Sequence, residues 1–342
     1  MQQFTTNLTK WIFSLLVLGF LPHLNHAQID LSDQIPFDPE VRTGVLENGL
    51  TYYIKANSKP ENIAELRLVV NAGSLQENDD QQGLAHFLEH MCFNGTEDFP
   101  KNEIINYMES IGSQFGAHVN AYTSFDETVY SLRVPTDEKN KFNTGLQILE
   151  NWAHRVTMEG EEIDKERGIV IEEWRSRLGA QDRMQEKTLP AIFYNSRYAE
   201  RLPIGKKDII ESFEYETIRS FYRTWYSTDL MAVVVVVYID MDEVEGTIEK
   251  MFAPIKAQEN PVPRENTDIP DHSDPQIAIA TDIEAPYNIL QMLYKHPRST
   301  AETIEDYRKS MVNQMASRMI GDRLQELMNA ASPPFSYAGA GF

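Results

Sequence analysis

The chain alternates segments in which apolar residues recur every second position with longer segments in which they recur every three to four. The first kind is rich in β-branched and aromatic residues, which is typical of strands. The strand patterns are Leu50–Lys55, Ala64–Val70 and Thr128–Val134. The helical patterns are Gly83–Met91, Lys101–Ile111, 138–158 and 162–178. A continuous apolar run, Leu230–Ile239, is typical of a strand that is covered on both faces.

The pattern changes after residue 254. Residues 255–275 are rich in proline and charged residues, which predicts a linker. Beyond the linker, residues 276–281 and 289–294 have strand patterns and residues 303–330 have a helical one. Because this order repeats the opening of the first unit, we expect residues 276–342 to be an incomplete second domain homologous to the first.

The first 27 residues have the pattern of a secretory signal peptide. Lys10 is the only charged residue among them, and it precedes the apolar run Trp11–Leu21. That run is shorter than the roughly 20 residues that a membrane-spanning helix needs, and Ala27 offers a small residue for cleavage. An uncleaved anchor is the alternative. The prediction is export to the periplasm or beyond, with a first domain at 28–254 and no stable membrane anchor once the signal is removed.

Composition narrows the class of protein. The 342 residues include 31 Lys and Arg against 52 Asp and Glu, so the formal net charge is −21. This acidic balance argues against nucleic acid as a partner, because phosphate binding needs concentrated positive charge. The single cysteine, Cys92, excludes an internal disulfide and a cysteine-rich metal site. We expect Cys92 to be a small buried apolar residue rather than a nucleophile.

The motif that carries chemistry is His86-x-x-Glu89-His90, within the predicted helix at 83–91. On a helix these three side chains share one face. Two imidazoles one turn apart can bind the same metal ion, and the carboxylate beside them can take a proton from water. The alternative is an ordinary polar helix face that carries two histidines.

A catalytic zinc ion usually has a third protein ligand. The helix at 162–178 offers Glu166 and Glu173, which lie two turns apart and therefore on one face, whereas Glu172 is rotated away by about 100°. If Glu173 is the ligand, Glu166 is placed to support a ligand or the attacking water from behind. The alternative is that these acidic residues are solvated, as acidic side chains on helices usually are.

The segment Gly83–Thr96, followed by Glu166-Arg-x-x-Val-x-x-Glu173, closely resembles the pitrilysin/insulinase family of zinc metallopeptidases, especially its exported and processing-peptidase-like bacterial members. The resemblance implies an α+β metallopeptidase roll with a mainly antiparallel sheet packed by helices. It also implies one zinc ion per chain held by His86, His90 and Glu173, with Glu89 as general base. The family motif selects Glu173 over Glu172 and gives Glu166 its supporting role.

A second match to the family is the segment from Asn120 to Tyr130. In the family this segment is an edge strand beside the zinc ion, to which the peptide substrate adds as a further strand. An edge strand has unpaired N–H and C=O groups that suit this role. Asn120, Ala121 and Tyr122 are therefore the expected substrate contacts, and an ordinary hairpin edge is the alternative.

The sequence thus predicts an exported zinc metalloendopeptidase that cleaves peptides or unfolded segments. One rival is a non-catalytic, peptide-binding member, although the intact His86, Glu89 and His90 set argues against it. Another is a half-enzyme. In the family a second homologous half closes the site and supplies an Arg/Tyr pair, so a second half or subunit is an expected partner besides the peptide substrate.

Overall fold

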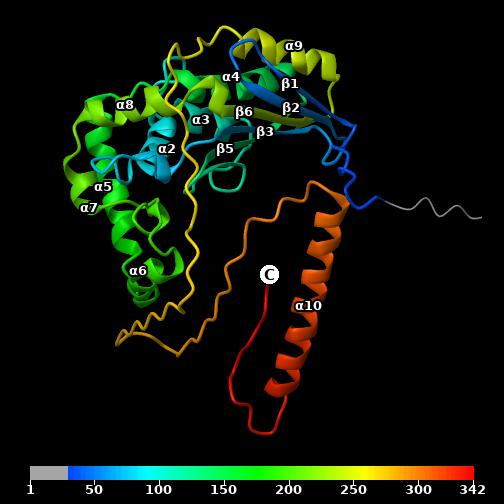
Figure 1. Cartoon of the computed structure of the whole chain (residues 1–342). Coiled ribbons are helices and arrows are strands. Elements are labelled where there is room, and N and C mark those ends of the chain that lie inside the picture. Colours follow the sequence, from blue (N-terminus) through cyan, green and yellow to red (C-terminus); the bar gives the residue numbers. More distant parts are fainter. Residues whose placement is uncertain (1–29) are drawn as a thin grey trace, which may run out of the picture. The chain divides into compact units, whose positions relative to one another are not determined.

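The computed structural model describes residues 30–342, and the predicted signal peptide lies outside the described residues. The described residues fall into two compact units (Figure 1). One unit is Asp38–Lys295, and the other joins residues 30–37 to His296–Phe342. Within residues 30–342 no helix is long and apolar enough to cross a membrane.

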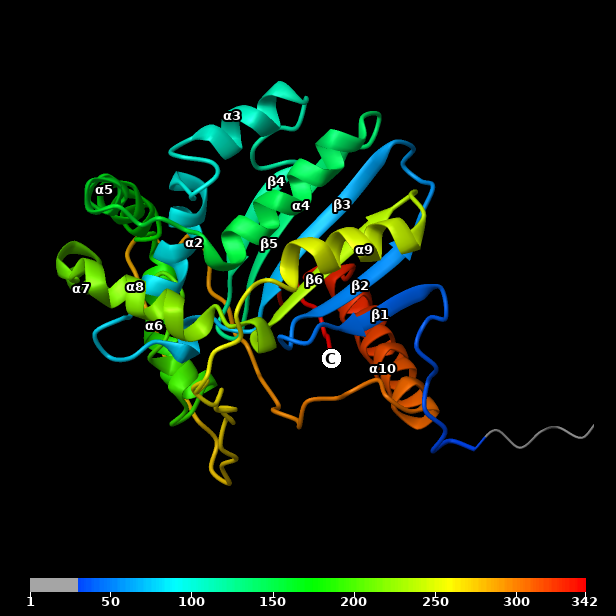
Figure 2. The same ribbon diagram turned by 90° about the horizontal axis from the view of Figure 1, so that it is seen from above.

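The larger unit is built on one mixed sheet in the order β1-β2-β6-β3-β5-β4 (Figure 2). Strands β2 and β6 run parallel, and every other neighbouring pair is antiparallel. The strands are β1 (Val41–Val45), β2 (Thr51–Ala56), β3 (Ile63–Val70), β4 (Val119–Thr123), β5 (Thr128–Pro135) and β6 (Met231–Val237). A mainly antiparallel sheet combined with helices confirms the predicted α+β class.

Two helices cover one face of the sheet, namely α4 (Lys139–His154) and α9 (Met241–Phe252). Figure 2 shows both of them lying over the strands. Apolar residues at helical spacing form the contact. They include Leu146 and Leu149 of α4 and Val244 and Ile248 of α9, all fully buried. Their burial fixes the side of the sheet on which the core of this unit lies.

The other face of the sheet is less covered, which corrects one expectation. In β6 the alternate residues Val233 and Val235 are fully buried, whereas Val234 and Val236 are only half-buried. The prediction that both faces of this strand are covered was therefore wrong for one face. The physical reason is that α4 and α9 pack on the same side, so the apolar residues of the opposite side are only partly covered within this unit.

A second group of helices gathers beside β4, where α2 (Leu84–Asn94) contacts β4, α5 and α8. The other helices of this group are α3 (Glu103–Ser110), α5 (Gly160–Ser176), α6 (Ala180–Ile192), α7 (Lys207–Ser212) and α8 (Tyr215–Trp225). The fully buried Trp152 of α4 donates its Nε1–H to the carbonyl oxygen of Cys92 at 2.7 Å. This bond ties the end of α2 to the core. Cys92 itself is buried, as expected.

The start of α2 depends on a glycine and on the buried carboxyl group of Glu77. Gly83 precedes the helix with φ +105°, a conformation that favours glycine. The Glu77 Oε1 atom accepts the N–H of Gly83 at 3.0 Å and the N–H of Ala85 at 2.9 Å. The first N–H groups of a helix lack acceptors within the helix, and Glu77 supplies an acceptor at the start of α2.

The predicted strands at 276–281 and 289–294 were wrong. Neither segment forms a strand, and Ile277 and Leu290 are 82% and 88% exposed. A strand pattern becomes a strand only when its N–H and C=O groups find a partner, and the described residues place no strand beside either segment. This segment is instead held to the rest of the larger unit by contacts such as the Arg183–Asp282 ion pair, at 2.7 Å.

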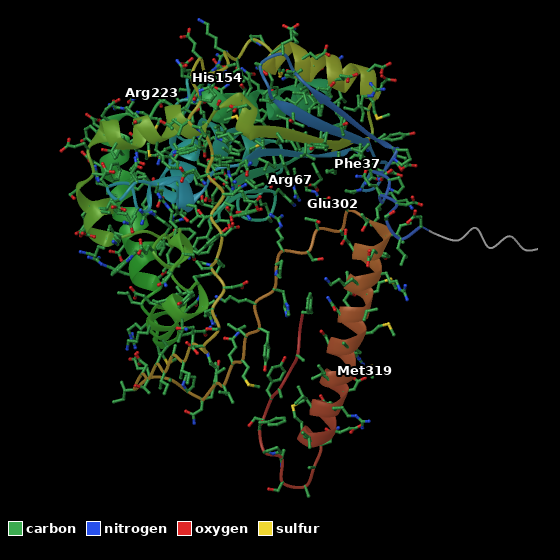
Figure 3. The ribbon with its side chains drawn as sticks, in the orientation of Figure 1. Phe37, Arg67, His154, Arg223, Glu302 and Met319 are labelled. Atoms are coloured by element: carbon green, nitrogen blue, oxygen red, sulfur yellow. The ribbon has the colours of Figure 1, made fainter. Side chains whose placement is uncertain are left out.

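The smaller unit contains the long helix α10 (Ile304–Met328), which confirms the helix predicted at 303–330. Thr303 and Asp306 form a reciprocal capping box at its start. Residues 30–37 join this unit through a bridge between Gln34 and Thr303. Within the helix no residue is fully buried, and Met319, labelled in Figure 3, is 68% exposed.

The buried Glu77 carboxyl should make stability depend on pH. Burial raises its pKa from an ordinary 4.5 to about 8. Between these values the folded state keeps a proton that the unfolded state has released, so stability falls as pH rises through this window. Glu77→Gln keeps an acceptor oxygen but stays neutral. The difference in free energy of unfolding between Glu77→Gln and wild type should therefore shift in favour of the variant by roughly 2 kcal/mol or more when the pH is raised from 5 to 8.

Urea unfolding of the metal-free proteins at pH 5 and pH 8 measures this difference. The matched control is Glu259→Gln, which changes an exposed carboxylate, and it should track wild type at both values. If the free energies of unfolding of Glu77→Gln and wild type differ by the same amount at pH 5 and at pH 8, the prediction is contradicted.

Candidate metal centre

Helix α2 presents the motif residues on one face and its apolar residues on the other. Leu84, Phe87, Leu88 and Met91 are buried in the core, with at most 1% exposed. They fix the rotation of the helix about its axis, which turns the opposite face toward α5. On that face His86 is 8% and Glu89 is 9% exposed, while His90 is half-buried.

Helix α5 supplies two carboxylates to this face. Its buried apolar residues Ile163 and Val170 anchor it, and Glu166 is also buried. The two-turn spacing predicted that Glu166 and Glu173 share a face, and both carboxylates lie against the histidines of α2. Glu172 does not. Its side chain is 68% exposed and pairs with Arg175.

Three atoms form a nearly equilateral triangle. The Nε2 atoms of His86 and His90 are 3.3 Å apart. The Glu173 Oε2 atom lies 3.6 Å from Nε2 of His86 and 3.5 Å from Nε2 of His90. In a tetrahedral zinc site with bonds of about 2.0–2.1 Å, ligand atoms are separated by about 3.3–3.4 Å. The triangle therefore has the size of one face of such a site, and these residues fit a zinc ion.

Neighbouring groups orient two of the three candidate ligands. The Glu166 Oε1 atom lies 2.8 Å from Nδ1 of His90, so that a proton on Nδ1 leaves the Nε2 lone pair for a metal. Asn94 donates to the other oxygen of Glu166. In the same way, the Arg177 guanidinium holds Oε1 of Glu173 at 2.6 Å and leaves Oε2 within the triangle.

Asn94 and Arg177 were not identified from the sequence. Asn94 lies four residues after His90 at the end of α2, and Arg177 lies four residues after Glu173, directly after the end of α5, so each is about one helical turn further on. That spacing is the only signal that the sequence offers for them.

The pKa shifts of the site favour the metal-binding forms of His86 and Glu173, whereas at His90 a proton competes with a metal ion. Burial, with help from nearby His90, lowers the pKa of His86 to about 4, which keeps this imidazole neutral. Burial acts on the pKa of His90 in the same direction, but the bond to Glu166 and the surrounding carboxylates outweigh it and raise that pKa. Burial disfavours ionised Glu173, but the hydrogen bond and the charge of Arg177 oppose this effect, and the pKa of Glu173 is lowered. Neutral imidazole and ionised carboxylate are the forms that bind metals.

Glu89 lies outside the triangle but is electrostatically coupled to it. Burial raises the pKa of Glu89, while a hydrogen bond from Thr123 and the charge of His90 oppose this rise. A carboxylate with a raised pKa is a stronger base, so the environment of Glu89 suits proton transfer.

The predicted substrate residues lie on β4, which is an edge of the sheet. Asn120 and Tyr122 are exposed and Ala121 is half-buried. Asn120 Oδ1 accepts the N–H of Ala121 at 3.0 Å, and Tyr122 donates its hydroxyl to Glu127 at 2.8 Å. The strand pairs with β5 on one side, and α2 also contacts it. The structure thus places this edge next to the helix that carries His86 and His90.

Comparison with known proteins gives two adjacent family matches. Residues 52–203 match the model for insulinase (peptidase family M16), and residues 212–333 match the model for the peptidase M16 inactive domain. The first match includes every candidate site residue. The second begins at the last residue of α7 and extends through the predicted linker and α10 to residue 333.

Similar curated proteins are zinc proteases. The chain is 34% identical over 327 residues to the probable zinc protease PqqL of Haemophilus influenzae, a match that covers 94% of this chain and 34% of the relative. It is 36% identical to the probable zinc protease PqqL of Escherichia coli over 298 residues, covering 85% of this chain and 31% of the relative. The chain thus spans about a third of the length of these relatives.

Solved structures of one of these relatives are also similar to this chain in fold. The first half of the periplasmic protease PqqL from E. coli is 32% identical, with a TM-score of 0.76 over 90% of this chain and 65% of that one. The whole E. coli protease matches with a TM-score of 0.73 at 31% identity, covering 87% of this chain and 33% of that one. From these matches and the fold we conclude that the chain belongs to the insulinase family of peptidases, family M16.

Proposed function

We propose that this chain is the metal-binding, catalytic part of an exported zinc metalloendopeptidase. The observation that carries the proposal is the triangle of His86 Nε2, His90 Nε2 and Glu173 Oε2, with sides of 3.3–3.6 Å, beside the buried carboxylate of Glu89. One zinc ion per chain would be held by these three residues. When bound, zinc activates water as a nucleophile and polarises a carbonyl group.

The residues of the chain divide the remaining work. Glu89 takes the proton of the attacking water and can pass it to the leaving amine, which is the role of a general base followed by that of a general acid. Glu166 holds His90 through Nδ1, and Arg177 holds Glu173. The exposed edge of β4, at Asn120, Ala121 and Tyr122, aligns an extended peptide as an added strand.

The E. coli relative is a periplasmic protease, and the N-terminal sequence pattern also favours export. We propose a periplasmic or secreted location for this chain. The substrates would be peptides or unfolded segments, because only an extended backbone can add to a strand edge. A second homologous half or subunit would close the site.

The second candidate is a peptide-binding member that is either non-catalytic or a half-enzyme that requires a partner half. The observation that favours it is that the chain spans about a third of its curated relatives. Zinc content together with peptide cleavage separates the two roles.

Glu89→Gln should keep zinc and lose hydrolysis, because it removes the base without touching a candidate ligand. We expect one zinc per chain and a fall in kcat of about 10³-fold or more. Metal analysis and a fluorogenic peptide assay, with the downstream half added, measure the two effects. His86→Ala is the contrasting variant and should lose zinc. Equal loss of zinc from both variants would contradict the assignment of Glu89 as the base and His86 as a ligand.

Glu173→Gln should weaken zinc binding far more than Glu172→Gln, because the two neighbouring carboxylates point in different directions. We expect a loss of affinity above about 100-fold for Glu173→Gln and less than about threefold for Glu172→Gln. Competition with a chromogenic chelator gives both dissociation constants. The reverse order would assign the third ligand to Glu172.

Residues 28–342 should bind one zinc ion, because all three candidate ligands lie between His86 and Glu173. Without a second half to close the site, these residues should hydrolyse peptides poorly. The developing oxyanion also needs fixed donors, and the loss of one donor costs about 10²–10³ in rate. Apolar residues exposed along α10 should also favour pairing or aggregation. The test is a peptide assay with and without the downstream half. High activity from a monodisperse monomer would reject the need for a partner.

A further inference from the structure

The general base is held by a strand that is remote from it in sequence. Thr123, the last residue of β4, donates its hydroxyl to Oε2 of Glu89 at 2.6 Å, across 34 positions of the chain. Both side chains are largely shielded from solvent, Glu89 being 9% exposed and Thr123 half-buried. A short bond from a hydroxyl to a buried carboxylate is among the stronger hydrogen bonds in proteins.

The position of Thr123 is fixed by the backbone of its hairpin. Thr123 pairs with Thr128 of β5, and the turn that follows is closed by a bond from Ser124 N–H to the carbonyl of Glu127 at 2.8 Å. Ser124 in turn accepts the N–H of Ser74 at 3.1 Å. The hydroxyl of Thr123 therefore lies on a rigid element rather than on a loose loop.

Two further segments anchor the tip of the same turn. Asp126 accepts the hydroxyl of Tyr198 on one carboxylate oxygen, at 2.8 Å. Its other oxygen accepts a bond from the largely buried Arg264, at 3.0 Å. These partners come from the segments that follow α6 and α9. Together with the segment of Ser74, three distant parts of the chain contact the hairpin that carries Thr123.

A hydroxyl at this place has a consequence for proton transfer. A carboxylate can rotate about its terminal bond, and a donor fixed on one oxygen stops that rotation. The other oxygen is then available to a water molecule in a constant direction. Since misplacement of a catalytic group by about 1 Å can cost 10²-fold in rate, a fixed orientation matters.

We propose that Thr123 is a positioning residue for the general base: its hydroxyl holds Oε2 of Glu89 and leaves Oε1 to accept the proton of the attacking water. The proposal rests on the peptidase function proposed above, in which Glu89 is that base. It also means that β4 both aligns the peptide and holds the base, so that the two are placed relative to each other by a single strand.

Three variants test the proposal. Thr123→Val replaces the hydroxyl with a methyl group of similar size, and Thr123→Ser restores it. Thr128→Val is the matched control, because it removes a buried hydroxyl from the partner of Thr123 in the same hairpin, one that bonds to the Ala72 carbonyl at 3.0 Å and not to Glu89. All three should bind zinc as wild type does.

With the downstream half added, Thr123→Val should lower kcat about 10- to 30-fold and leave KM unchanged, because the base is misoriented while the strand edge is intact. Thr123→Ser and Thr128→Val should stay within about threefold of wild type. An equal loss of kcat in Thr123→Val and Thr128→Val would overturn the proposal, since it would mark a general effect on the hairpin.

A second readout does not need activity. In metal-free protein labelled with ¹³C-glutamate, the carboxyl resonance of Glu89 is identified by its absence from Glu89→Gln. At fixed pH this resonance should shift in Thr123→Val and stay in place in Thr123→Ser and Thr128→Val. An unchanged resonance in Thr123→Val overturns the proposal. If wild type with its partner half cleaves no peptide, the proposed function fails, but this resonance still decides whether Thr123 holds Glu89.

Discussion

The contact between α2 and α5 is the constraint on which the candidate site depends. Each helix alone carries an incomplete set of ligands, two imidazoles on α2 and one carboxylate on α5. The 2.8 Å contact between Glu166 and His90, two turns before Glu173, sets the register of one helix against the other. With that register fixed, Glu173 Oε2 reaches a point almost equally distant from both Nε2 atoms. The two helices together hold the three candidate ligand atoms at the spacing of a zinc site.

The rest of the unit holds these two helices in place. Glu77 and Gly83 fix the start of α2, and Trp152 fixes its end through the carbonyl of Cys92. The β4–β5 hairpin then touches the same helix through Thr123 and Glu89. Polar groups hold α2 at its ends and on the face that carries His86 and Glu89, while its apolar face packs in the core. Rigid support of this kind is what catalytic geometry requires.

The parts of the site that could be predicted from the sequence are those whose residues lie close together along the chain. His86, Glu89 and His90 lie within one turn of helix, so spacing alone brings them together, and the i, i+7 pair of Glu166 and Glu173 is equally local. Thr123 and Arg177 escaped notice as partners of this site because their roles depend on how a hairpin and two helices meet. The strands predicted at 276–281 and 289–294 were wrong for the same reason, because a strand forms only beside a partner strand, and the local sequence pattern does not specify that partner.

The most direct test of the central claim is the zinc K-edge X-ray absorption spectrum of the purified chain, recorded with its zinc content. The account predicts one zinc ion per chain, nitrogen and oxygen neighbours at about 2.0–2.1 Å, multiple scattering from two imidazoles and no sulfur neighbour. A chain that retains no zinc, a spectrum that fits a single imidazole, or a sulfur neighbour at about 2.3 Å would contradict it.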